Sequence, residues 1–339
     1  MQVGSYTEFA APTVNYGVGW GRANYHPGAK AGDGTDAGAV AVFLLEHLVE
    51  SGRYSWDGYA AHWLKQIQDG YGSCNFQSVG REFTGDCPPG MKPGYLNGGT
   101  RRTLDAIQRY PGAKGEQRKA LAADVNCLVS ATHWPPLLLL PYESEEALVR
   151  DAVSTVYLSH RNRDPVAAAA FLSRTAFRIV HGGESLEGAL RSAAATQGDA
   201  FITARLDEAL AKVAEAADAG SQLAKQGRFI DDVAITSLAR LWEVGKEEPI
   251  KVGKASPVEG ALPASLYFAL RYQDSLEQAL IANANVGGDS AARGMVIGTL
   301  LGAVHGETAV PERWLKTLNA LPRVRSLLEQ LEKGSRTEL

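Results

Sequence analysis

Glycines spaced four residues apart near the end of the chain constrain its fold more than any other feature. They are Gly294, Gly298, Gly302 and Gly306. At 3.6 residues per turn they share one face of a helix, so that face carries no side chains. Glycine inside a helix costs about 1 kcal/mol relative to alanine at each position. We therefore predict a buried helix at the centre of the fold, from Ser290 to Val304, with another segment packed closely against its bare face.

The residues just before this helix predict a tight turn that places a carboxylate at the helix start. Gly287 and Gly288 precede Asp289 and Ser290. Paired glycines are typical of turns, and Asp is a preferred N-cap residue. The partial positive charge of a helix N-terminus also favours an anion at this point. Asp289 is therefore predicted to cap the central helix.

The rest of the chain predicts further helices and no sheet. Apolar residues recur at helical spacing, and no segment alternates with a period of two over five or more residues. The predicted helices cover residues 37–49, 56–68, 100–109, 117–140 (interrupted at 133–136), 145–159, 164–180, 185–196, 200–219, 231–244, 257–272, 274–284 and 321–333. We predict a compact all-α fold in one domain spanning residues 1–339, with its core at about 4–314.

Composition excludes several classes of partner and location. The net charge of -4 and the pI near 6.0 provide no basic surface for nucleic acid. No apolar run reaches the roughly 20 residues of a membrane span, and the N-terminus has no secretion signal. The cysteines are Cys74, Cys87 and Cys127, without metal-type spacing. We expect a cytoplasmic protein with reduced thiols and no nucleic-acid or membrane partner.

Motifs in the last third of the chain resemble the C-terminal signature of the ADP-ribosylglycohydrolase family. They are Gly287-Gly288-Asp289, Gly302-Ala303-Val304-His305-Gly306 and Val310-Pro311-Glu312-Arg313-Trp314. The resemblance extends from about Gly4 to Trp314. It implies a helical fold and a hydrolase that cleaves a glycosidic bond of ADP-ribose or a related ribosyl compound. The implied ligand is ADP-ribose, or a similar ribosyl group, free or attached to protein.

The resemblance also assigns roles to individual residues. The catalytic candidates are Glu8, Asp33 and Asp289. The ligand-binding candidates are Asp36, His160, Gly287, Gly288, Ser290 and Arg293, where Ser159-His160 is similar to a Thr-His pair at the ligand of the family. Relatives that cleave ADP-ribose use two divalent cations, so the resemblance implies metal ligands as well. The candidates here are Asp33, Thr35, Asp36 and Asp289, for at most one weakly held ion such as magnesium.

Two departures from the family pattern remove carboxylates from this set. The second Asp and the Thr of the C-terminal motif are Ala291 and Ala292. Near the N-terminus two registers against the family's Thr-Asp-Asp-Thr are open. The preferred register places Asp33-Gly34-Thr35 on Asp-Asp-Thr, and the other places Thr35-Asp36 on Thr-Asp. Either one loses an aspartate, as Gly34 or as Ala37.

Arg293 offers a replacement for the lost cations. It lies four residues after Asp289, so the two side chains share a helix face. We hypothesise that its guanidinium pairs Asp289 bidentately where a cation would sit in relatives. The alternative is an ordinary surface ion pair worth less than about 1 kcal/mol.

The same departures keep a second function open. A member without these carboxylates can be a catalytically inactive protein that binds a ligand or serves structurally. A third interpretation, an enzyme with a different ribosyl substrate, follows from the segment Cys127–His133. It stands where the family has Gly-Asn-Gly-x-x-Met-Arg, with Cys127-Leu128-Val129 in place of Gly-Asn-Gly and His133 in place of the Arg.

Overall fold

The computed structural model describes residues 32–70, 94–238, 240–241, 250–251 and 256–337. Within these residues the chain is helical, apart from one antiparallel pair of two-residue strands, β1 (Arg240–Leu241) and β2 (Ile250–Lys251). The all-α prediction is therefore confirmed. The α-helices are α1 (Asp36–Ser51), α2 (Trp56–Asp69), α4 (Gly98–Arg109), α5 (Gly115–Ala120), α6 (Glu145–Val156), α7 (Arg163–Gly182), α8 (Leu186–Gln197), α9 (Ala200–Ala217), α10 (Ile230–Leu238), α11 (Val258–Arg271), α12 (Leu276–Asn285), α13 (Ser290–His305), α14 (Glu312–Thr317) and α15 (Leu321–Thr337). The 3₁₀-helices are η1 (Leu128–Thr132), η2 (Pro135–Leu139), η3 (Ala224–Phe229) and η4 (Glu307–Ala309).

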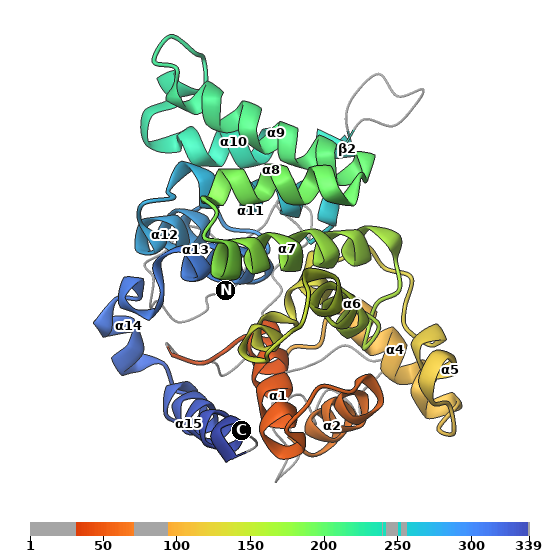
Figure 1. Ribbon diagram of the computed structural model, residues 1–339. Helices are drawn as coiled ribbons and strands as arrows, with labels where there is room; N and C mark the ends of the chain where they lie inside the picture. The colour runs from red at the N-terminus through yellow and green to blue at the C-terminus, as the bar shows by residue number, and fades with distance from the viewer. Residues whose placement is uncertain (1–31, 71–93, 239, 242–249, 252–255, 338–339) are drawn as a thin grey trace.

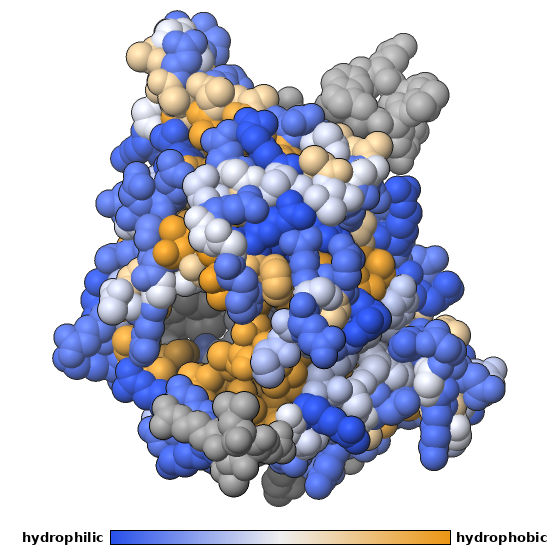
Figure 2. All heavy atoms as spheres, viewed as in Figure 1, coloured by the Kyte–Doolittle hydropathy of each residue, from blue (hydrophilic) through white to orange (hydrophobic). Residues whose placement is uncertain are grey.

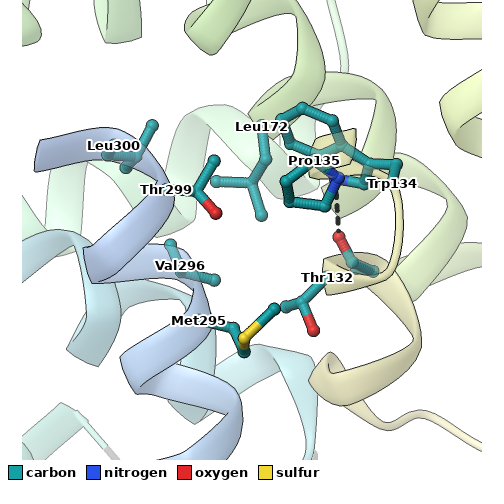
Figure 3. A pocket seen from close by; sticks show the side chains of 9 residues that line it. Thr132, Trp134, Pro135, Leu172, Met295, Val296, Thr299 and Leu300 are labelled. Carbon is teal, nitrogen blue, oxygen red and sulfur yellow. Dashed lines mark hydrogen bonds between the residues drawn. The ribbon is translucent and has the colours of Figure 1, made fainter. Parts of the chain in front are cut away.

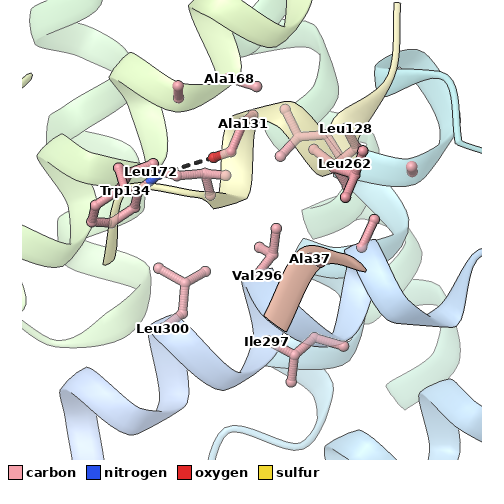
Figure 4. Close-up of a cluster of buried hydrophobic side chains, with 14 of the residues drawn as sticks. Ala37, Leu128, Ala131, Trp134, Ala168, Leu172, Leu262, Val296, Ile297 and Leu300 are labelled. Atoms are coloured by element: carbon pink, nitrogen blue, oxygen red, sulfur yellow. Dashed lines mark hydrogen bonds between the residues drawn. The ribbon is translucent and has the colours of Figure 1, made fainter. Parts of the chain in front are cut away.

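Helix α13 lies at the centre of the fold, as its sequence predicts. It packs against α7, α11, α12, η1 and α1 (Figure 1). Its residues Val296, Ile297 and Leu300 are buried among side chains of α7, η1 and α11 (Figure 4). Helices α8, α9 and α10 gather at one end of the molecule, and α1, α2 and α15 at the other. Helix α13 lies between these two groups of helices.

The glycines of α13 do not share one role, contrary to the prediction of close packing along the whole face. A Cβ atom at Gly294 would lie 3.5 Å from Nδ2 of Asn283 in α12, which is ordinary van der Waals contact. At Gly298 and Gly302 no atom of the described residues lies within 4 Å of such a Cβ. Gly306 ends the helix with φ of 73°. Among the described residues, none packs against these glycines more closely than a Cβ atom would allow, so the prediction of close approach is wrong there.

The segment predicted as a helix over residues 117–132 is mostly irregular. Helix α5 ends at Ala120, and the chain resumes helical turns only in η1 and η2. In η1, the hydroxyl of Ser130 donates to the Cys127 carbonyl at 3.0 Å, and that of Thr132 donates to the Val129 carbonyl at 2.7 Å. Such local bonds compete with the α-helical ladder, and the following prolines cannot extend it. The helical prediction for this segment is wrong for these reasons.

Other boundaries differ by smaller amounts. Helix α6 ends at Val156 rather than at residue 159, and α10 ends at Leu238, before β1. The C-terminal helix α15 runs over Leu321–Thr337 and packs on α1. There Nε of Arg323 donates to the buried carboxylate of Glu46 at 2.6 Å. Among the described helices, none combines the length and the apolar content that crossing a bilayer requires.

Candidate functional site

The turn before α13 places Asp289 at the helix start. Gly287 and Gly288 have φ of 71° and 73°, a left-handed conformation that residues with a Cβ rarely adopt. Asp289 follows with only 7% of its surface exposed, and its Oδ1 accepts a hydrogen bond from the backbone N–H of Ala292 at 3.2 Å. The predicted N-cap is therefore confirmed. Ser290 begins α13 and is buried beside it.

Arg293 is buried behind this turn, and among the described residues its hydrogen bonds go to the neutral groups of Asn283 and Gly287. Its Nε donates to Oδ1 of Asn283 at 2.7 Å, and its Nη2 donates to the carbonyl of Gly287 at 2.5 Å. Asn283 in turn donates from Nδ2 to the carbonyl of Ser290 at 2.9 Å. The structure thus directs the guanidinium to Asn283 and Gly287, and not to the bidentate pair with Asp289 that the sequence suggested. The charge of Asp289 still acts on Arg293 through space and favours its charged form.

The start of α1 presents the other carboxylate of the site. Asp36 is the first residue of α1, and Thr35 is the N-cap residue, whose side chain makes no capping hydrogen bond. Asp33 lies apart from both, exposed on the surface, where it accepts a hydrogen bond from Nδ2 of Asn319 at 2.7 Å. Of the two aspartates, Asp36 thus lies at the helix start and Asp33 on the surface, and the register against the family motif stays a prediction.

Asp36 and Asp289 lie close enough to influence each other. Burial and, to a smaller extent, the negative charge of Asp289 together raise the pKa of Asp36 to about 7, against hydrogen bonds from the Ala37 backbone and the Asn97 side chain. Tyr95 has a raised pKa because of its burial and the charges of Asp36 and Asp289. Burial, with a contribution from Asp289, raises the pKa of Cys127 to about 12. A perturbed carboxyl beside another carboxylate is typical of functional sites.

A small hollow borders Asp36 on its inner side. It is lined by Asp36, Val40, Phe43, Trp63, Ile67, Leu96, Asn97, Thr100 and His133. The Asn97 side chain connects this hollow to α4, because its Oδ1 accepts from the backbone N–H of Thr100 at 2.9 Å and caps that helix. The walls are mainly apolar, with polar groups at Asp36, Asn97 and His133.

Two buried histidines stand behind the hollow. Nδ1 of His133 has no hydrogen-bond partner among the described residues, and burial together with nearby His160 lowers the pKa of His133 to about 3. His160 is fully buried, with Nδ1 2.8 Å from Oγ of Ser159, and burial lowers its pKa to about 4. Its ring packs against Gly99, where a Cβ atom would overlap it. Both imidazoles are therefore neutral near pH 7.

A second hollow lies between α13, α7 and the η1–η2 segment and is mainly apolar. It is lined by Ala131, Thr132, Trp134, Pro135, Leu172, Met295, Val296, Thr299 and Leu300 (Figure 3). Nε1 of Trp134 donates to the Ala131 carbonyl at 2.9 Å, so the indole is fixed. The surface view in Figure 2 shows a mostly hydrophilic face with apolar residues gathered around a recess beside α1. The polar groups of the candidate site are thus those at the starts of α1 and α13.

The structure groups the predicted site residues unevenly. The turn before α13 contains Gly287, Gly288 and Asp289, and Ser290 begins the helix. Arg293 lies in α13 and bonds to this turn, and Asp36 lies near it. His160 lies further inside, beneath the start of α4, and Asp33 lies on the surface. Glu8 lies outside the described residues.

Sequence reasoning did not select Tyr95, Asn97 or His133 for the site. The sequence Asn97-Gly98-Gly99-Thr100 did show a cap, which is the one local signal that could have pointed to Asn97. Nothing local marked Tyr95 or His133, because their position depends on packing between distant segments.

One comparison with known proteins identifies a family, and a second identifies a similar fold. A family model described as ADP-ribosylglycohydrolase matches residues 2–338. A solved structure titled "ADP-ribosylglycohydrolase-related protein complex" is similar with a TM-score of 0.57 and 20% sequence identity, covering 96% of this chain and 93% of that chain. At this identity the likeness concerns the fold. No curated protein matches the chain.

Proposed function

Because the chain belongs to the ADP-ribosylglycohydrolase family, we propose that it hydrolyses a glycosidic bond of ADP-ribose or of a related ribosyl compound. One observation carries the proposal. Asp36 and Asp289 come from the starts of two different helices and lie close enough that the charge of Asp289 raises the pKa of Asp36. Glycoside hydrolysis commonly needs two carboxyl groups, one of them protonated near neutral pH.

The chemistry assigned to the two carboxyls differs. Asp36, with its pKa raised to about 7, can hold a proton and give it to the leaving atom as the glycosidic bond breaks. Water adds to the anomeric carbon and gives one proton to a base, for which Glu8 is the predicted residue. That proton then passes to Asp36, which returns to its starting protonated form. Asp289 keeps Oδ1 on the helix cap, and its charge favours the positive character of an oxocarbenium-like transition state. Glu8 remains a predicted base.

We also propose that the site does not hold the pair of divalent cations that the family resemblance implies. Two such ions need several anionic oxygens. The described residues include no group of three or more His, Cys, Asp or Glu placed to hold a metal ion. Ala291 and Ala292 supply no ligand, and the buried cation of Arg293 stands behind Asp289. Calorimetric titration with magnesium and manganese tests this. Binding of two ions with micromolar Kd to the wild type would end the proposal.

The rival function is ligand binding without catalysis. The alanines at positions 291 and 292 favour it, because they replace an Asp and a Thr of the family motif. The same protein preparation can distinguish the two functions. An inactive member would bind ADP-ribose in calorimetry and release none from modified protein.

The deciding experiment measures release of ADP-ribose from ADP-ribosylated protein, with magnesium and with a chelator. It compares the wild type with Asp36→Asn and with Asp105→Asn, a matched control whose carboxylate pairs with Arg109 on the exposed side of α4. We expect release by the wild type and the control, and loss in Asp36→Asn. Absence of both release and binding in the wild type would refute the proposed function.

A further inference from the structure

The most unusual buried group near the site is the guanidinium of Arg293, with 1% of the residue exposed. Burial lowers its pKa only to about 10, so it stays charged at neutral pH. A buried charge is expensive unless it is hydrogen-bonded, and breaking such an arrangement is strongly destabilising. Removing the hydrogen-bond partners of Arg293 is therefore expected to destabilise the fold.

The hydrogen bonds of Arg293 tie together the two helices that flank the turn. Its Nε reaches the side chain of Asn283, near the end of α12, and its Nη2 reaches the carbonyls of Gly287 and, at 3.5 Å, of Asn283. Asn283 closes the loop by donating to the carbonyl of Ser290 in α13.

This network fixes the backbone of the turn that contains Gly287 and Gly288. Gly287 and Gly288 can adopt many backbone conformations, and each residue fixed in one of them costs about 1–2 kcal/mol of conformational entropy. Directional bonds from a planar guanidinium to a carbonyl inside the turn select one conformation. That conformation determines where Asp289 points.

The bonds of Arg293 to Asn283 and Gly287 go to neutral acceptors, which matters for Asp289. A bidentate ion pair would occupy both carboxylate oxygens. Here the Arg293 bonds leave the Asp289 carboxylate out of the network, while the arginine charge still acts on it. The turn thus orients the Asp289 carboxylate, and Arg293 does not occupy both of its oxygens with a bidentate ion pair.

We propose that Arg293 is a positioning residue, which, with Asn283, fixes the double-glycine turn so that Asp289 can accept hydrogen bonds from the hydroxyl groups of a ribosyl ligand. The ligand part rests on the proposed function. Geometry is essential to this role, so a lysine, which keeps the charge and lacks the planar fork, cannot perform it.

The test measures binding of ADP-ribose to the full chain by calorimetry. We expect Arg293→Lys and Asn283→Ala each to weaken binding at least tenfold. In the Asp289→Asn background, Arg293→Lys should have no further effect on affinity, because Arg293 acts through Asp289. The matched control is Arg174→Lys, since Arg174 is also buried but pairs with Glu145 and Glu146 away from the turn. It should keep wild-type affinity.

Several results would overturn the proposal. Wild-type affinity in Arg293→Lys would show that charge alone suffices, and wild-type affinity in Asn283→Ala would show that the tie is not needed. Additive losses from Arg293→Lys and Asp289→Asn would show that the arginine acts independently. If Arg293→Lys does not fold, Asn283→Ala decides alone.

The positioning role and the proposed function can fail separately. If the wild type does not bind ADP-ribose, the proposed function fails, and amide hydrogen exchange of residues 287–292 then tests the turn by itself. Faster exchange in Asn283→Ala than in the wild type, without a change in α7, supports the positioning role. Unchanged exchange contradicts it.

Discussion

The starts of α13 and α1 present the same residue type in two different settings. Asp289 precedes α13, caps it through the Ala292 N–H and sits on a turn tied by Arg293. Asp36 is already inside α1, behind Thr35, whose side chain caps nothing. The Asp289 carboxylate accepts a hydrogen bond from the backbone. The Asp36 carboxyl is buried beside that charge, and its pKa is raised to about 7.

This difference shows how position relative to a helix decides what an aspartate does. One residue before the helix, a carboxylate accepts a backbone N–H and stabilises the fold. One residue later, the side chain of Asp36 meets Tyr95 and Asn97, and burial favours its protonated form. The start of α13 is therefore suited to fixed charge, and the start of α1 to proton transfer.

The largest expected effect comes from removing the titrating group. Asp36→Asn should lower the rate of ADP-ribose release at least 100-fold, the range of a lost general acid. It should not lower stability. A carboxyl with a raised folded-state pKa opposes folding as pH rises from 3.8 towards 7, and the amide removes that penalty. Initial rates and thermal midpoints at pH 7.5 measure both. A variant that is active, or that unfolds more readily than the wild type, would break the comparison.

The second effect is acid sensitivity on the α1 side, where His133 and His160 lie behind the hollow. Their folded-state pKa values, about 3 and about 4, are below the ordinary 6.5. Below pH 6.5 the unfolded chain takes up protons first, so stability falls by up to about 1.4 kcal/mol per pH unit for each histidine. Urea unfolding between pH 7 and 5 measures this slope. His133→Gln should make the slope shallower, and an unchanged slope would contradict the assignment.

The third effect distinguishes the capping hydrogen bond of Asp289 from its negative charge at the start of α13. Asp289→Ala should cost about 1 kcal/mol of unfolding free energy, because the Ala292 N–H loses its acceptor. Asp289→Asn should cost less, because Asn is also a good N-cap, yet it should weaken ADP-ribose binding by the same factor as the alanine variant, with measurable binding left in both. Urea titrations and calorimetry on both variants provide the comparison. Equal stability losses would mean that charge, not capping, holds this turn.

The smallest effect is expected at the uncapped helix. Thr35→Ala should change the unfolding free energy by less than about 0.5 kcal/mol, since the Thr35 side chain makes no capping bond. The matched positive control is Ser144→Ala, because Ser144 caps α6 by accepting from the Ala147 N–H and should cost more. A larger loss at Thr35 than at Ser144 would show that the two helix starts are more alike than the structure indicates.

Sequence patterns were sufficient for the fold and for half of the site. The apolar periodicity and the turn before α13 located the central helix and its cap, because these depend on neighbouring residues. The choice between Asp33 and Asp36 could not be made this way, since it depends on where Tyr95 and Asn97 pack. The irregular course from α5 to η2 was missed because hydroxyl bonds to nearby carbonyls override an otherwise helical pattern.

The packing of His160 on Gly99 also restricts how such a chain can change over evolutionary time. A side chain at position 99 would overlap the imidazole, so it is tolerated only after position 160 has lost its ring. The order of the two changes is therefore fixed, and the reverse order passes through a chain that cannot fold in this form. Related chains that keep the histidine should keep the glycine. Chains with a ring at 160 and a side chain at 99 would show that the backbone of α4 can move aside.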